Sequence, residues 1–91
     1  MSVAVEEVFD VDVAFRTEVS GEFKDEVTAV FSGEIERGGL SCYAHVGQHS
    51  VAGQGWYRQT RPASAEESAE LAAELETIGY RVRKVSRVRW S

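Results

Sequence analysis

The stretch "SAEESAELAAELETIG", residues 64–79, decides the fold because it predicts one amphipathic helix. Ser64 and Glu67 form a capping box, in which each side chain bonds a backbone N–H that the first helical turn leaves unpaired. Gly79 is typical of the position just after a helix. The apolar stripe of the helix consists of Leu71, Leu75 and Ile78, at spacings of i, i+4 and i+7.

Three segments before the helix alternate between apolar and polar residues, which predicts three β-strands. They begin at Phe9, Glu26 and Leu40, and the third ends at Val46. Gly21 predicts a turn after the first strand, and the pair Gly38-Gly39 predicts a two-residue hairpin turn after the second. Gly33, inside the second segment, indicates a bulge.

The remaining segments complete an α+β order. Residues 47–55 are expected to form a loop, residues 56–60 a short strand or extended segment, and residues 80–90 an edge strand with a bulge at Arg83-Lys84. We therefore predict one domain over residues 1–91. Its antiparallel β-sheet is a three-stranded meander plus one or two further strands, with one amphipathic α-helix packed on one face.

Composition excludes several classes of protein. With 43% hydrophobic and 27% charged residues, the chain is typical of a globular domain and not of a disordered one. Its single cysteine, Cys42, excludes an internal disulfide and fits a reducing compartment. The N-terminal residues lack a signal-peptide pattern, and no apolar run is long enough to cross a membrane, so we expect a cytoplasmic protein with no membrane partner.

The net charge of −5 is strongly segregated along the chain. Residues 1–37 carry a net charge of −7 and residues 79–91 a net charge of +5. The acidic balance makes nucleic acid an unlikely partner, because such binding neutralises phosphates with Lys and Arg. The basic residues Arg81, Arg83 and Lys84 have two interpretations: they protect an edge strand and pair with acidic segments, or they contact an anion or nucleic acid.

A run of twenty residues, Gly38 to Tyr57, contains no charged side chain. Within it, "CYAHVGQHS", residues 42–50, holds the only cysteine and both histidines. The alternation predicts that Cys42, Ala44 and Val46 belong to the core. If these residues face the helix, Tyr43 and His45 lie on the opposite, helix-free face of the sheet.

The residue pattern does not favour a metal or catalytic site, so we predict neither a cofactor nor catalytic residues. His45 is expected on a strand and His49 in a loop, and zinc needs three or four ligands. Cys42 alternates with core residues, and nothing near Ser50 marks an oxyanion hole. The activity class nevertheless stays open, since a metal protein or enzyme that uses His45 and His49 is the alternative.

Two motifs carry a resemblance: "CYAHVGQHS", and then "WYRQTRPASAEESAELAAELETIGY". Together they resemble a family of small uncharacterised proteins of bacteria, phages and prophages, whose pattern is Cys-Tyr-x-His-x-Gly-Gln-His, then Arg-Pro-Ala, Glu-Glu and Ile-Gly-Tyr. The match covers residues 27–85, with Ser32 where the family often has Pro. The resemblance implies an accessory role for a mobile element, such as inhibiting or sequestering a component of host defence.

We therefore predict a non-enzymatic binding protein that holds a protein partner or a small anionic ligand. Directional hydrogen bonds and aromatic stacking suit recognition by a neutral surface. Self-association as a homodimer through the helix-free sheet face would bury Tyr43 and His45. A nucleic-acid binder that uses the basic C-terminal strand is a further alternative. The predicted binding residues are Tyr43, His45, Gln48, His49, Ser50, Tyr57 and Arg61.

Overall fold

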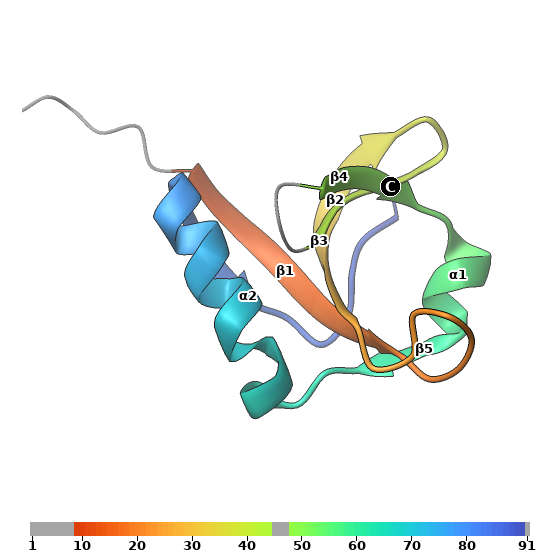
Figure 1. Ribbon diagram of the computed structural model, residues 1–91. Coiled ribbons are helices and arrows are strands. Elements are labelled where there is room, and N and C mark those ends of the chain that lie inside the picture. The colour runs from red at the N-terminus through yellow and green to blue at the C-terminus, as the bar shows by residue number, and fades with distance from the viewer. Residues whose placement is uncertain (1–8, 45–47, 91) are drawn as a thin grey trace, which may run out of the picture.

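The computed structural model describes residues 9–44 and 48–90, and it is an α+β domain, as predicted (Figure 1). Its helices pack on a sheet of six strands. The elements in chain order are β1 (Phe9–Glu18), β2 (Val27–Glu36), β3 (Gly39–Ala44), β4 (Gln48–Ala52), α1 (Gln54–Arg58), β5 (Thr60–Pro62), α2 (Ala65–Ile78) and β6 (Tyr80–Lys84).

Strand β1 organises the sheet, whose order is β4-β3-β2-β1-β5. One edge of β1 pairs antiparallel with β2 over residues 13–17, and its other edge is shared by two strands. Its last residues, 16–18, pair antiparallel with β5, and its first residues, 9–13, pair parallel with β6. A parallel partner requires a crossover, and α2 supplies it between β5 and β6. The predicted edge position of the final strand is confirmed.

The predicted signals of α2 are present. The Ser64 hydroxyl accepts the Glu67 N–H at 3.1 Å, the Glu67 carboxylate accepts the Ser64 N–H at 2.8 Å, and Gly79 ends the helix with a φ of 126°. Leu71 and Leu75 are fully buried. The predicted stripe is wrong at its end, because Ile78 is 52% exposed. The third buried residue is Ser68, one turn before Leu71.

Two apolar clusters lie on opposite faces of the sheet. The helix-side cluster contains Val13, Phe15, Ala29, Phe31, Tyr43, Leu71 and Leu75. The second-face cluster contains Val30, Leu40, Cys42 and Ala52. The prediction that Tyr43 is exposed on a helix-free face is therefore wrong, since Tyr43 is 2% exposed against α2. Tyr43 pairs with Ala29, which in turn pairs with Phe15, so it belongs to the row of side chains under the helix.

The second face is not open either. Residues 85–90 run behind the sheet in Figure 1, and Val88 and Trp90 pack on the second-face cluster together with Trp56 and Tyr57. The Arg89 backbone bonds the bulge of β2: its N–H donates to the Ser32 hydroxyl at 2.8 Å, and its carbonyl accepts the Gly33 N–H at 2.9 Å. Gly33 has a φ of 77°, which confirms the predicted bulge.

Three local predictions need correction. The expected loop at residues 47–55 holds β4 and the start of α1, and residues 56–60 are mainly helical rather than extended. Five-residue elements are too short to show a clear period. The hairpin turn is centred on Arg37-Gly38, both at positive φ, one residue earlier than expected. The final strand ends at Lys84 without the expected bulge, and the chain leaves it to cover the second face.

Replacing Leu71 with Ala is expected to lower the free energy of unfolding by about 2–5 kcal/mol, because the site is fully buried under the sheet. Ile78→Ala is the matched control and is expected to cost about 0.5 kcal/mol or less, since that side chain is half exposed. Urea unfolding measures both changes. Equal losses in the two variants would contradict this placement of the helix.

Candidate functional site

A cleft of about 270 Å³ lies on the second face of the sheet, between the β3–β4 hairpin, the loop of residues 19–26 and α1. We call it the second-face cleft. Its apolar and aromatic lining includes Cys42, Ala44, Ala52, Trp56 and Phe23. Its charged lining residues are Glu18 and Glu26, so the cleft combines aromatic rings with negative charge.

The floor and one wall of this cleft are fixed by regular structure. Cys42 and Ser50 are register partners in β3 and β4, and the thiol sulfur lies 3.1 Å from the hydroxyl oxygen. On α1, the indole N–H of Trp56 donates to a Glu18 carboxylate oxygen at 3.4 Å. This contact ties the aromatic wall to the end of β1. Of the predicted binding residues whose side chains the structure describes, Ser50 lines the cleft.

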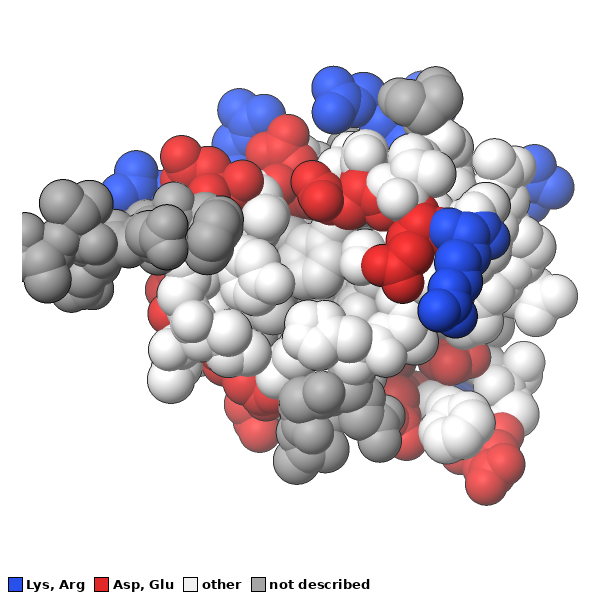
Figure 2. All heavy atoms as spheres, turned by 90° about the horizontal axis from the view of Figure 1, so that it is seen from above, with Lys and Arg blue, Asp and Glu red and all other residues white. Residues whose placement is uncertain are grey.

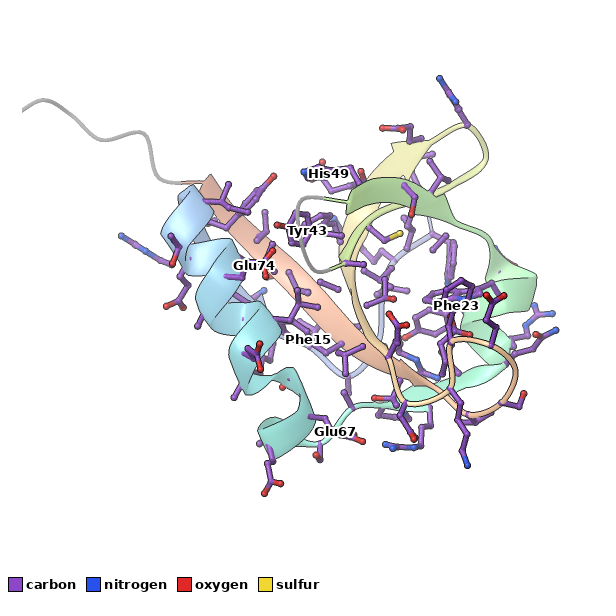
Figure 3. All side chains as sticks on the ribbon, viewed as in Figure 1. Phe15, Phe23, Tyr43, His49, Glu67 and Glu74 are labelled. Carbon is purple, nitrogen blue, oxygen red and sulfur yellow. The ribbon has the colours of Figure 1, made fainter. Side chains whose placement is uncertain are left out.

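The other wall is a loop that projects a large apolar side chain. The Asp25 N–H donates to the Glu18 carbonyl at 2.8 Å, and the Glu18 N–H donates to the Glu26 carbonyl at 3.0 Å, so the loop is closed at its base. Phe23 lies within it and is 54% exposed (Figure 3). Sequence reasoning missed Phe23, although a phenylalanine inside the charged segment "GEFKDE", residues 21–26, was a visible signal.

Tyr43 and His49 meet on the opposite face, beside α2 (Figure 3). Their rings are in edge contact, with centroids 4.8 Å apart. The Tyr43 hydroxyl donates to a carboxylate oxygen of Glu74 on α2. The structure thus brings two of the predicted binding residues together, but Tyr43 is buried and joins the β3–β4 hairpin to the helix. His49 is the exposed member of the cluster, and Glu74 is half-buried.

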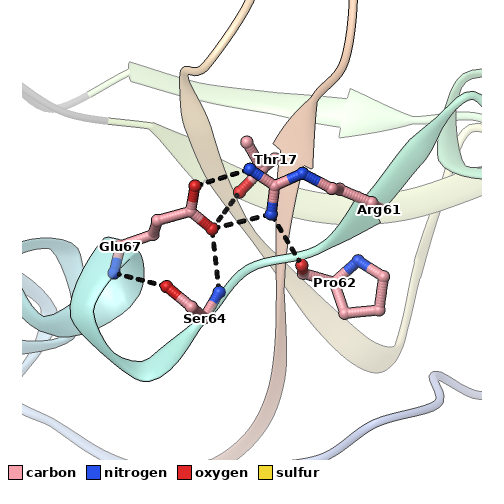
Figure 4. A network of polar contacts seen from close by, with 5 residues as sticks. All are labelled: Thr17, Arg61, Pro62, Ser64 and Glu67. Atoms are coloured by element: carbon pink, nitrogen blue, oxygen red, sulfur yellow. Dashed lines mark hydrogen bonds and ion pairs between the residues drawn. The ribbon is translucent and has the colours of Figure 1, made fainter.

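Tyr57 and Arg61, two other predicted binding residues, have structural partners. The Arg16 guanidinium lies 4.3 Å from the centre of the Tyr57 ring, and the Trp90 ring meets the same tyrosine edge-on. Arg61 forms a two-point ion pair with Glu67, with distances of 2.8 and 2.6 Å (Figure 4). His45 and the side chain of Gln48 lie outside the part of the chain that the structure describes.

The Glu67 carboxylate joins three elements (Figure 4). Besides the Arg61 guanidinium of β5, it accepts the Ser64 N–H and, at 3.3 Å, the Thr17 hydroxyl of β1. The hydrogen bonds from Arg61 and from the Ser64 backbone lower the pKa of Glu67 to about 2. This network fastens the start of α2 to the sheet.

The basic residues of β6 are partnered within the protein. Two guanidinium nitrogens of Arg83 lie 2.8 Å from the Asp12 carboxylate, and this contact lowers the pKa of Asp12. Arg81 lies 3.5 Å from Asp10, and the Lys84 ammonium donates to the Ser68 hydroxyl at 3.2 Å. Of the two interpretations of this strand, the contacts agree with edge protection and pairing with the acidic first strand.

Within residues 9–44 and 48–90, no three His, Cys, Asp or Glu side chains are grouped so that they could hold a metal ion. In the same ranges, no helix is both long and apolar enough to cross a membrane. Comparison with protein-family models, curated proteins and solved structures finds no match. The resemblance drawn from the sequence therefore stays a prediction.

The Glu67 network predicts how stability depends on pH. A folded-state pKa of about 2, below the ordinary value of 4.5, means that the carboxylate stabilises the fold above about pH 5 and loses this effect as the pH falls toward 2. The urea midpoints of the wild type and Glu67→Gln should therefore differ at neutral pH and converge in acid. Glu66→Gln, on the same helical turn, is the control and should show less convergence. A constant difference down to about pH 2 would contradict this role for the carboxylate.

Proposed function

We propose that this chain is a small protein-binding module whose second-face cleft receives an arginine or lysine side chain of a partner protein. The observation that carries the proposal is the combination of Glu18 and Glu26 with Trp56 and the exposed Phe23 in one cleft. Carboxylates hydrogen-bond guanidinium and ammonium groups, and aromatic faces attract the same cations. Phe23 supplies the apolar contact area that marks many interaction sites.

The charges of the described residues favour a basic partner over the small anionic ligand that the sequence also suggested. The guanidinium groups of Arg61, Arg81 and Arg83 are paired with carboxylates. The charged groups that line the cleft are both acidic. The net charge of −5 would in addition attract a basic surface over a distance.

Recognition accounts for the cleft better than catalysis does. Cys42 is 4% exposed, and its sulfur contacts the Ser50 hydroxyl rather than an activating base. A cleft of this charge complements a basic site on another protein. We therefore propose that the inhibitory or sequestering role implied by the resemblance would operate by occupying such a site.

A peptide pair tests the cation preference directly. An acetylated and amidated Gly-Arg-Gly peptide should shift the Trp56 indole N–H signal in proton–nitrogen correlation NMR, with the signal identified by its loss in Trp56→Phe. The same peptide with citrulline, which has the shape of arginine without its charge, should bind about fivefold more weakly, equivalent to about 1 kcal/mol. Glu26→Gln should reduce the binding of the arginine peptide by a similar factor.

Glu76→Gln, on the exposed surface of α2, is the matched control and should bind the arginine peptide like the wild type. Equal shifts with arginine and citrulline, or unchanged binding in Glu26→Gln, would refute the cation site. A response to free arginine amide that equals the response to the peptide would assign the cleft to a small organic cation and would overturn the choice of a protein partner.

A further inference from the structure

The two edges of the sheet are protected very differently. The edge formed by β5 and β6 carries Pro62, Arg81 and Arg83, which are features that keep a strand from pairing with another chain. At the other edge, β4 pairs with β3 alone among the described strands. Its sequence, Gln-His-Ser-Val-Ala, has no charged residue and no proline, and it lies inside the uncharged run of twenty residues.

We propose that β4 is a docking edge for β4 of a second copy of this chain. The two strands would pair antiparallel across a two-fold axis and join two sheets into one. The proposal rests on the β4 edge and does not depend on what the second-face cleft binds.

The strand pairing determines which backbone N–H and C=O groups of β4 point toward the outer edge of the sheet. The Phe15 carbonyl accepts the Ala63 N–H at 2.8 Å, so the polar backbone groups of Phe15 face away from β2. Along an antiparallel sheet, directly paired residues alternate between hydrogen-bonded and non-hydrogen-bonded pairs. Phe15 pairs with Ala29, Ala29 with Tyr43, and Tyr43 with His49. The alternation therefore turns the N–H and C=O groups of His49, and likewise of Val51, toward the free edge.

One register between the two β4 strands places all the outward N–H and C=O groups of His49 and Val51 in hydrogen bonds. With Ser50 opposite Ser50 of the partner subunit, His49 of each copy lies opposite Val51 of the partner subunit. Both positions are hydrogen-bonded pairs, which makes four backbone hydrogen bonds in total. Within Gln48–Ala52, a register centred on His49 contains one such pair, His49 with His49 of the partner subunit, and it would bring two imidazoles together. The proposed register places small hydroxyls at the axis and sets no like charges opposite one another.

A second copy fits this edge because the strand is compatible with itself. The same pairing of β6 with its own copy would bring arginines together, and like charges directly opposite are destabilising. Figure 2 shows the molecule from above, the side on which β4 lies in Figure 1. The largest uncharged area of this face is bordered by Asp and Glu; most Lys and Arg lie at the margin of the view, and some Lys or Arg atoms also lie within the face, next to acidic atoms.

The dimer would place two clefts close together. Ser50 lines the second-face cleft, and residues directly opposite in an antiparallel pair project to the same face. The clefts of the two copies would therefore open on one face of the joined sheet, on either side of the axis. A partner with two basic side chains would then be held at two points.

Sedimentation equilibrium of the full chain over a wide concentration range tests the proposal. The wild type should show twice the chain mass at high concentration. Ser50→Lys and Ser50→Glu should each be monomeric, because each sets two like charges against each other at the axis. An equimolar mixture of the two variants should recover the dimer mass, since Lys then faces Glu. Ser86→Lys, an identical change at an exposed position of the C-terminal segment, should dimerise like the wild type.

Circular dichroism and urea midpoints check that the variants fold, which is expected because Ser50 is exposed. Val51→Pro is a second variant: it removes an outward N–H that β3 does not use, so it should also be monomeric and folded. A wild type that stays monomeric throughout would overturn the proposal. So would a dimer that survives Ser50→Lys and Val51→Pro, or a mixture of the Lys and Glu variants that stays monomeric.

Discussion

The backbone pairing of β1 is the interaction on which the rest of the structure depends. One edge of β1 is bound by β2, and the other is divided between antiparallel β5 and parallel β6. Because the last strand is parallel to β1, the chain has to cross a face of the sheet between β5 and β6, and this crossing is α2. Ion pairs reinforce the arrangement at both ends: Arg83 with Asp12 along β6, and Arg61 with Glu67 where β5 leads into the helix.

A sheet with one helix still has a second apolar face to bury. In this chain α1 and the C-terminal segment of residues 85–90 cover that face, and both contribute aromatic side chains. The tail is held by backbone bonds to Ser32 and Gly33 in the bulge of β2. The bulge in β2 thus binds the C-terminal segment of residues 85–90 and also bends the strand. The second-face cleft lies on this same face, where the loop of residues 19–26 and α1 form its walls.

Local signals in the sequence predicted the parts of the fold that local interactions determine. The capping box, the glycine stop, the meander and the charged edge strand belong to this group. Alternation also separated Cys42 from Tyr43 correctly, but it could not say which face the helix covers, because strand register and the crossover decide that. The short elements β4 and α1 were missed for lack of a measurable period, and Phe23 was missed because its role depends on a loop shaped by long-range contacts.

The uncharged run of residues 38–57, which first suggested a single recognition surface, divides into parts with different roles. Tyr43 anchors the hairpin to α2, Cys42 and Ser50 line the cleft, and β4 offers an edge without charge or proline. The proposed dimer requires that this edge pair with β4 of a second copy. Hydrogen exchange at single-residue resolution tests it most directly, since the outward amides of His49 and Val51 should be protected at high protein concentration and should exchange faster on dilution, while the inward amide of Ser50 stays protected. Exchange of His49 and Val51 that is fast and independent of concentration would contradict the claim.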